Sequence, residues 1–106
     1  MADTRRIDQV YLGIFRTNAS HPPLPAGREE MMQRHHDYLQ DLQKSGVLYG
    51  AGSNKDVTGV RHGGGIIIVR ARSLEEAREI LGREPFTAAG ERTPEVLPWA
   101  RSWFGE

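Results

Sequence analysis

Apolar residues occupy both faces of a segment near the start of the chain, and their alternation predicts a β-strand from residue 7 to residue 16. Val10 and Leu12 fall on one face of this strand, and Tyr11 and Phe15 fall on the other. A sheet strand with one side in water usually keeps one polar face. We therefore expect both faces of this strand to be buried.

A second pattern, with apolar residues three or four positions apart, predicts a helix from about Gly27 to Ser45. On a helical wheel of about 100° per residue, the residues within about 60° of His35 are Met31, Met32, Tyr38, Leu39 and Leu42. His36 lies about 100° away, on the flank of the helix. An imidazole in the middle of an apolar stripe either forms a structural hydrogen bond within the core or takes part in chemistry. His35 is therefore the first candidate for a functional residue.

The remaining segments are shorter, and turn residues separate them. In order, we expect a proline-rich loop over 17–26, a strand over 47–53, a glycine-rich loop over 54–65, a strand over 65–71, a helix from 73 to about 82, and an extended segment within 91–104. Gly46 stands where a helix C-cap is expected. Ser73 and Glu76 have the spacing of a capping box, and Pro85 prevents a simple continuation of the second helix.

This order of elements is that of the ferredoxin-like α+β fold (βαββαβ), in which a four-stranded antiparallel sheet carries two helices on one face. Because the strands at 7–16 and 65–71 are apolar on both sides, the second face of the sheet also needs a cover. We predict a homodimer in which two sheets pack face to face, as in a dimeric α/β barrel. The alternative is that the C-terminal segment with Trp99, Trp103 and Phe104 covers this face within one chain.

Length and composition indicate a single domain over residues 1–106. The chain has 14 basic and 14 acidic residues and no cysteine. Balanced charge argues against general nucleic-acid binding, and the lack of cysteine excludes thiolate metal sites and thiol nucleophiles. No run of about 18 apolar residues marks a membrane helix, and the first residues lack the apolar stretch of a secretory signal. We therefore expect a cytoplasmic protein that does not bind membranes.

The four histidines do not form a metal-binding pattern. His35 and His36 diverge by about 100° on a helix, and no His-x-x-x-His spacing brings two imidazoles together, so we expect neither a metal nor a cofactor. His62 begins a glycine run that precedes a strand and not a helix, which favours a flexible hairpin over a phosphate site. His21, in the proline-rich loop, is either exposed or part of a lid.

Five short motifs occur in a fixed order along the chain: His35-His36-Asp37-Tyr38-Leu39, Gly46-Val47-Leu48-Tyr49-Gly50-Ala51-Gly52, Ser73-Leu74-Glu75-Glu76-Ala77-Arg78, Glu84-Pro85-Phe86 and Pro98-Trp99. In order and spacing they resemble the YCII-related family of small bacterial proteins, over nearly the whole chain. The resemblance implies the same dimeric ferredoxin-like barrel. It also implies an active site in which a histidine three residues before the helix tyrosine pairs with the acid before Pro-Phe. These two residues are His35 and Glu84.

The chain departs from the family pattern at two positions. The acid before Pro-Phe is usually aspartate, whereas Glu84 carries its carboxylate on a longer stem. The Gly-Pro at the end of the second strand is replaced by Gly52-Ser53, and we expect these two residues to contact a ligand. An alternative interpretation makes Arg83-Glu84 a solvated surface pair.

A carboxylate that accepts a hydrogen bond from one imidazole nitrogen leaves the other nitrogen to take or give a proton near neutral pH. We therefore predict a cofactor-independent enzyme in which His35 and Glu84 transfer a proton on a small aromatic or carbonyl compound. Its pocket is expected to be lined by Met31, Tyr38 and Ile68, with the Tyr38 hydroxyl facing the ligand.

The reaction would be an isomerisation or an elimination, and the resemblance implies the same class because dehydrochlorinase-type elimination is associated with one branch of the family. The alternative function is a non-catalytic domain that binds a small ligand or serves as an accessory. Nothing in the sequence selects a third possibility, a cofactor-free monooxygenase of the same barrel type.

Overall fold

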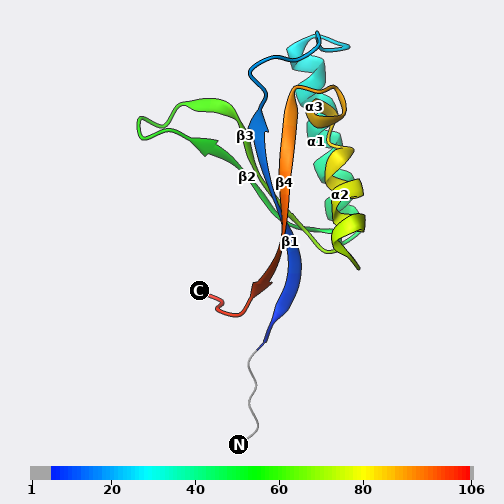
Figure 1. Cartoon of the computed structure of the whole chain (residues 1–106), viewed down its shortest axis with the longest axis vertical. Helices are drawn as coiled ribbons and strands as arrows, with labels where there is room; N and C mark the ends of the chain where they lie inside the picture. The colour runs from blue at the N-terminus through cyan, green and yellow to red at the C-terminus, as the bar shows by residue number, and fades with distance from the viewer. Residues whose placement is uncertain (1–5, 106) are drawn as a thin grey trace, which may run out of the picture.

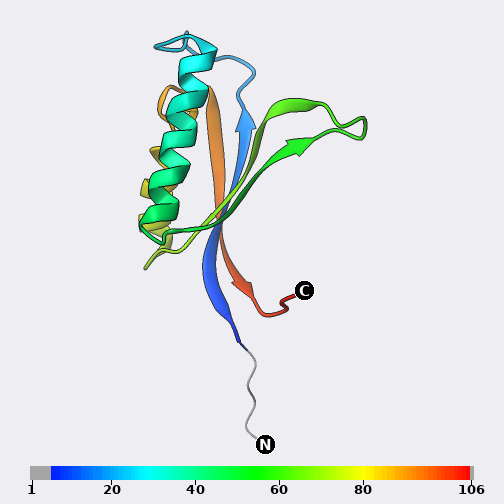
Figure 2. The ribbon, with the colours of Figure 1, turned by 180° about the vertical axis from the view of Figure 1, so that it is seen from behind.

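The computed structural model describes residues 6–105. The expectation that the chain lacks a secretory signal rests on its first residues, which lie almost entirely outside this range. The elements are β1 (Asp8–Thr17), α1 (Arg28–Lys44), β2 (Leu48–Lys55), β3 (Arg61–Val69), α2 (Leu74–Gly82), α3 (Pro85–Ala88) and β4 (Arg92–Arg101). The strands form one sheet in the order β2-β3-β1-β4, and all neighbouring pairs are antiparallel. The helices lie on one side of this sheet (Figures 1 and 2). These features confirm the ferredoxin-like α+β fold.

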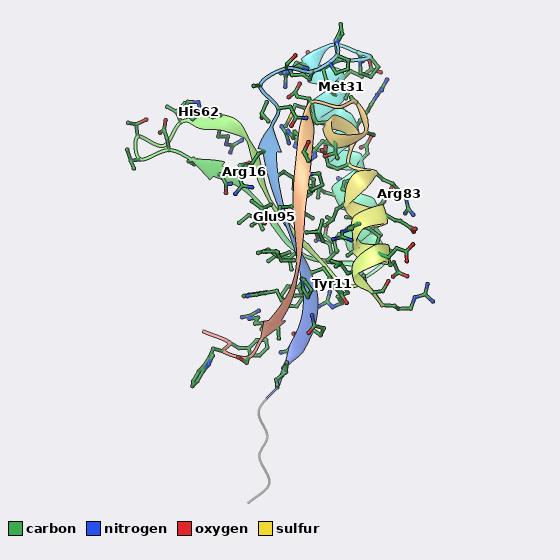
Figure 3. All side chains as sticks on the ribbon, in the orientation of Figure 1. Tyr11, Arg16, Met31, His62, Arg83 and Glu95 are labelled. Carbon is green, nitrogen blue, oxygen red and sulfur yellow. The ribbon has the colours of Figure 1, made fainter. Side chains whose placement is uncertain are left out.

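The core lies between the helices and one face of the central strands. Tyr11 and Phe15 of β1 and Ile67 of β3 are buried there against Ile80 and Leu81 of α2. Figure 3 shows Tyr11 from this core and Met31 on α1, whose side chain is 1% exposed. The apolar stripe predicted for α1 therefore does face the sheet.

The opposite face of the sheet carries no helix. Register pairs Leu12 with Leu97 and Val10 with Trp99, which places these side chains on the face away from the core. Leu97 and Trp99 are 40% and 42% exposed. The C-terminal segment does not cover the face with Trp103, which is 88% exposed. A second chain as the cover stays a prediction.

The helix ends follow the predicted signals closely. Gly46, after α1, has a φ of 77°, which is the left-handed conformation that glycine adopts at a helix C-terminus. The Ser73 hydroxyl accepts the Glu76 N–H at 3.0 Å, as a capping box requires. The Glu76 carboxylate, however, accepts the N–H of Arg72 and not that of Ser73.

One local expectation was wrong. The loop expected over 54–65 is shorter, because β2 continues to Lys55 and β3 already begins at Arg61. The sequence there is polar and glycine-rich, but cross-strand pairing extends the hairpin all the same. The second helix ends at Gly82 as predicted, and Pro85 then lies in the first turn of a short helix, α3, that the sequence pattern did not predict.

No helix in residues 6–105 is long and apolar enough to cross a membrane.

Candidate functional site

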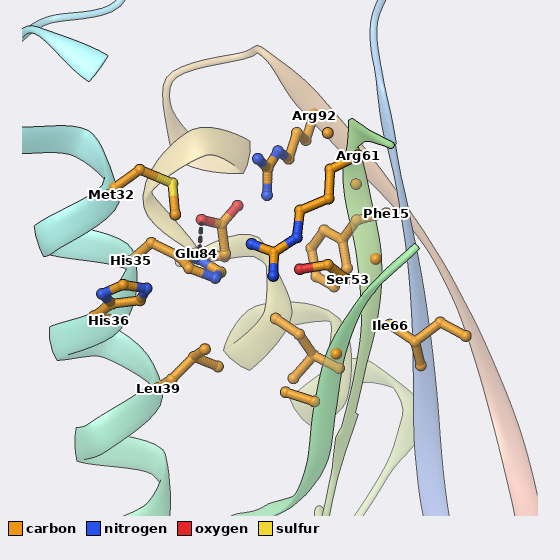
Figure 4. A pocket seen from close by; sticks show the side chains of 16 residues that line it. Phe15, Met32, His35, His36, Leu39, Ser53, Arg61, Ile66, Glu84 and Arg92 are labelled. Atoms are coloured by element: carbon orange, nitrogen blue, oxygen red, sulfur yellow. Dashed lines mark hydrogen bonds and ion pairs between the residues drawn. The ribbon is translucent and has the colours of Figure 1, made fainter. Parts of the chain in front are cut away.

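A pocket of about 440 Å³ opens between α1 and the β2–β3 hairpin (Figure 4). One wall comes from α1 and carries Met32, His35, His36 and Leu39. The opposite wall comes from the hairpin and includes Ala51, Gly52, Ser53, Arg61 and Gly63 through Ile67. Phe15, Glu84 and Arg92 complete the lining. The pocket thus collects side chains from segments that lie far apart in the sequence.

Two glycines bring the hairpin backbone close to its neighbours. A Cβ on Gly64 would crowd the Phe15 carbonyl of β1, and Gly64 has a φ of 76° that L side chains rarely adopt. A Cβ on Gly65 would collide with the Gly52 carbonyl of β2. The glycine run after His62 is therefore a packed part of the pocket wall and not a flexible loop.

His35 and Glu84 meet at the pocket wall, as the sequence predicts. His35 Nδ1 and Glu84 Oε2 are 2.9 Å apart, and their side chains are 16% and 1% exposed. An ionised carboxylate only accepts hydrogen bonds, so the imidazole nitrogen must be the donor. The alternative of a solvated Arg83-Glu84 pair is contradicted, because Glu84 is fully buried while Arg83 is exposed and points away from the sheet (Figure 3).

Glu84 is held by the start of α3 as well as by His35. Its Oε2 also accepts the Phe86 N–H at 3.0 Å, and its Oε1 accepts the N–H and the hydroxyl of Thr87 at 2.9 and 2.8 Å. A residue that caps a helix in this way satisfies backbone donors that have no partner within the helix. The sequence Glu84-Pro85-Phe86-Thr87 therefore fixes the carboxylate before any ligand binds.

These contacts keep Glu84 ionised. Burial alone raises the pKa of its carboxyl, but hydrogen bonds from His35, from the Phe86 N–H and from Thr87 outweigh it and hold the pKa below the ordinary value of 4.5. A buried carboxylate that stays charged is a strong acceptor for the imidazole N–H.

The second imidazole nitrogen of His35 is available to the pocket. His35 lines the pocket, and within residues 6–105 its Nε2 makes no hydrogen bond. In this range, Arg92 Nε is the one side-chain nitrogen or oxygen that is both buried and without a hydrogen bond. His35 Nε2 also has no hydrogen bond, so it is not buried. With Nδ1 donating to Glu84, Nε2 presents a lone pair to whatever occupies the pocket.

The structure brings together some of the other predicted ligand contacts but not all of them. Gly52 and Ser53 line the pocket. Met31 is buried in the protein and does not line it, and the neighbouring Met32 does so instead. The Tyr38 hydroxyl also lies outside the lining, and it donates a hydrogen bond to the Ile80 carbonyl at 2.7 Å. Burial raises the pKa of Tyr38 above its ordinary value. Ile68 does not line the pocket, whereas Ile66 and Ile67 of the same strand do.

Sequence reasoning missed two arginines and underrated His36. His36 lines the pocket although it lies on the flank of α1. The sequence gives no signal for Arg61, because the β2–β3 register shifts between the Ser53–Gly65 and Lys55–Arg61 pairs, so alternation from Ile67 does not place its side chain. Arg92 gave no such signal, since its direction depends on the register that pairs it with Thr17.

The remaining histidines lie outside the pocket lining, and within residues 6–105 no three His, Cys, Asp or Glu side chains form a cluster able to hold a metal. His21 is exposed, and its Nδ1 is 2.9 Å from the Pro22 carbonyl oxygen. His62 Nε2 is 2.6 Å from Asp56 near the hairpin tip.

Comparison with known proteins relates this chain to one family and one solved fold. The model of the YCII-related domain matches residues 11–100. A similar solved structure is 5-chloro-2-hydroxyhydroquinone dehydrochlorinase from Burkholderia phenoliruptrix AC1100, in complex with 2,5-dihydroxybenzoquinone. The TM-score is 0.55 at 18% sequence identity, over 85% of this chain and 92% of that chain, which shows a common fold. A search of curated proteins found no match.

Proposed function

The chain belongs to the YCII-related family, and from this premise we propose that it is a small cofactor-independent enzyme in which His35 and Glu84 transfer a proton. The substrate class is a small aromatic or carbonyl compound, and the reaction is an isomerisation or an elimination. The observation that carries the proposal is the 2.9 Å hydrogen bond between His35 Nδ1 and Glu84 Oε2 at the wall of the pocket.

In the proposed reaction, His35 Nε2 takes a proton from a carbon atom next to a carbonyl carbon. The electron pair of the broken C–H bond moves toward the oxygen and forms an enolate. The imidazolium that results is stabilised by Glu84, whose charge is already fixed in place. In an isomerisation the imidazolium returns the proton to a different carbon. In an elimination a leaving group, such as chloride, departs with its bonding electron pair.

The comparisons support this class of reaction at a coarse level. The similar dehydrochlorinase is named for an elimination on a small hydroxylated ring, and its solved complex holds a small quinone. The pocket of about 440 Å³ described above is of a size that suits a ligand of this kind.

Deuterium incorporation tests the proposal without knowledge of the natural substrate. The purified protein in D₂O is incubated with a panel of enolisable carbonyl compounds and chlorinated hydroquinones, and NMR follows C–H exchange and chloride loss. We expect exchange or elimination with members of the panel, and we expect His35→Asn to slow it about 100-fold or more. His21→Asn is the matched control, because His21 is exposed and lies outside the pocket lining.

If the wild-type protein binds panel compounds without exchange or elimination, the non-catalytic binding function replaces the proposed one. Equal rates for His35→Asn and the wild type would also contradict the role of His35.

We also propose that the active protein is a homodimer. The sheet face opposite the helices presents Leu97 and Trp99 at 40% and 42% exposure, beside Leu12 and Ile14 of the neighbouring strand. The sheet of a second copy is a suitable cover, because two such faces are self-complementary under a two-fold axis. The family resemblance supports the same arrangement.

A further inference from the structure

We propose that Arg61 and Arg92 form an anion-binding site in the pocket, so that the ligand is a small organic anion whose charged oxygens lie against both guanidinium groups. Figure 4 shows the two side chains entering the pocket from β3 and from the start of β4, on the same side as Glu84. This inference rests on the proposed function and adds the substrate class to it.

Arg92 is held in position, but within residues 6–105 its side-chain polar atoms have no hydrogen-bond partner. Its guanidinium carbon lies 4.2 Å from the centre of the Phe86 ring, a cation–π contact that fixes the side chain. Its Nε is buried and is the one such side-chain atom in residues 6–105 without a hydrogen bond. A buried donor of this kind costs free energy unless a partner arrives. The two Nη groups of Arg92 are not buried and make no hydrogen bond within residues 6–105, so an anion in the pocket would bind there.

Arg61 adds a second positive charge that has no counter-ion in the described part of the chain. The arginines that form ion pairs with carboxylates in residues 6–105 are Arg6, Arg16, Arg28, Arg34 and Arg72, and none of them lines the pocket. Neither Arg61 nor Arg92 lies within ion-pair distance of a carboxylate in this part of the chain.

Glu84 balances at most one of these two charges. It is the one carboxylate in the pocket lining, and its oxygens already accept hydrogen bonds from His35, from the Phe86 N–H and from Thr87. The adjacent Glu91 is likewise occupied, because both of its oxygens accept hydrogen bonds from Arg28. The pocket therefore has an excess of positive charge that a ligand must balance.

Guanidinium groups recognise planar anions through paired N–H donors. Both a carboxylate and an ionised phenol or enol offer a negatively charged oxygen in the plane of the molecule. Bound in this way, the substrate would lie with its charged oxygens toward Arg61 and Arg92 and a C–H bond toward His35. The two arginines would also stabilise the negative charge that builds up when His35 removes the proton.

The test compares two ligands of nearly the same shape but different charge. Benzoate and benzamide are titrated into the full-length protein at low ionic strength, and NMR follows the shifts of pocket residues. We expect benzoate to bind more tightly than benzamide, and we expect added salt to weaken benzoate alone. 2,5-Dihydroxybenzoquinone, the ligand of the similar structure, is a third probe that separates an ionised enol from a carboxylate.

Substitutions of the two arginines then test which side chain binds the anion. Arg61→Gln is expected to weaken benzoate binding by about tenfold or more and to leave benzamide unchanged. Arg92→Lys keeps the charge but removes the planar fork, so a smaller loss is expected. Arg78→Gln is the matched control, because Arg78 is exposed on α2 and lies outside the pocket lining.

Equal affinity for benzoate and benzamide, or no anion binding at millimolar concentration, would overturn the inference. So would an unchanged benzoate affinity in both Arg61→Gln and Arg92→Lys. These results are distinguishable from failure of the proposed function. A His35→Asn variant that binds benzoate in an Arg61-dependent manner, but exchanges C–H bonds as fast as the wild type, would contradict the enzyme and leave the anion site standing.

Discussion

Glu84 combines two tasks in one carboxylate: it caps α3 and it holds His35. Its Oε1 accepts from Thr87, while its Oε2 is shared between the Phe86 N–H and His35 Nδ1. The YCII-like motif pattern that the sequence resembles has aspartate at this position. The longer glutamate stem does not break the pairing here, because the carboxylate still reaches the imidazole from the helix N-terminus at 2.9 Å.

Replacement of Glu84 by Gln should change how stability depends on pH. The pKa of Glu84 lies below its ordinary value of 4.5, so its stabilising effect is complete above that pH and is lost as the pH falls through the lowered pKa. At pH 7 the variant should lose about 1–3 kcal/mol of unfolding free energy, because an amide cannot accept all of these hydrogen bonds.

Urea denaturation followed by circular dichroism across a pH series measures this effect. The gap between the wild type and Glu84→Gln should narrow toward low pH. Glu79→Gln is the control, because Glu79 is exposed on α2. A gap that stays constant with pH would show that the charge of Glu84 does not stabilise the fold.

At the scale of elements, the sequence predicts those residues whose burial repeats with the period of a helix or a strand. His35 was found because α1 repeats its apolar residues at helical spacing, and Glu84 was found from the family motif. Gly52 and Ser53 of the hairpin wall were predicted, but the part of the wall that β3 contributes was not, because Gly64 and Gly65 pack through backbone contacts that no apolar pattern reports. Arg92 was missed because its direction depends on strand register, which is a tertiary property.

The start of α1 is tied to the start of β4 by one ion pair. Both Glu91 oxygens accept from Arg28, at 3.0 and 2.8 Å, and the Glu91 side chain is 4% exposed. Arg28→Ala would leave this carboxylate buried without its cation. Because the Arg28 side chain is itself 60% exposed, we expect a moderate loss of about 1–2 kcal/mol in unfolding free energy.

Chemical denaturation measures the unfolding free energy of Arg28→Ala and compares it with that of the control variant Arg34→Ala. Arg34 lies on the same helix and pairs with Glu30 in an exposed setting, so its loss should cost about 0.5 kcal/mol or less. Equal stability losses in the two variants would mean that the Arg28–Glu91 pair does not tie the two elements together.

At the scale of the whole molecule, helices cover one face of the sheet, and within residues 6–105 no helix covers the other (Figures 1 and 2). This second face presents Leu97 and Trp99 at 40% and 42% exposure, on the same side as the exposed Arg16–Glu95 ion pair. The predicted homodimer would cover this face. Trp99 lies at the exposed face next to Val10, so Trp99→Glu should place a charge in the proposed interface and convert the dimer to a monomer.

Analytical ultracentrifugation measures this directly. Val57→Glu is the control, because it introduces the same charge at the fully exposed hairpin tip. A wild-type protein that sediments as a monomer at micromolar concentration, or a Trp99→Glu variant that remains a dimer, would contradict the proposed assembly.

The central claim is that Glu84 fixes the His35 ring so that Nε2 faces the pocket as a base. The most direct measurement is ¹⁵N NMR of histidine-labelled protein, which identifies the protonated nitrogen of the neutral ring. We predict that His35 carries its proton on Nδ1 in the wild type and that Glu84→Gln shifts both His35 nitrogen signals. A proton on Nε2 of the neutral ring, or a His35 spectrum unchanged by Glu84→Gln, would contradict the account.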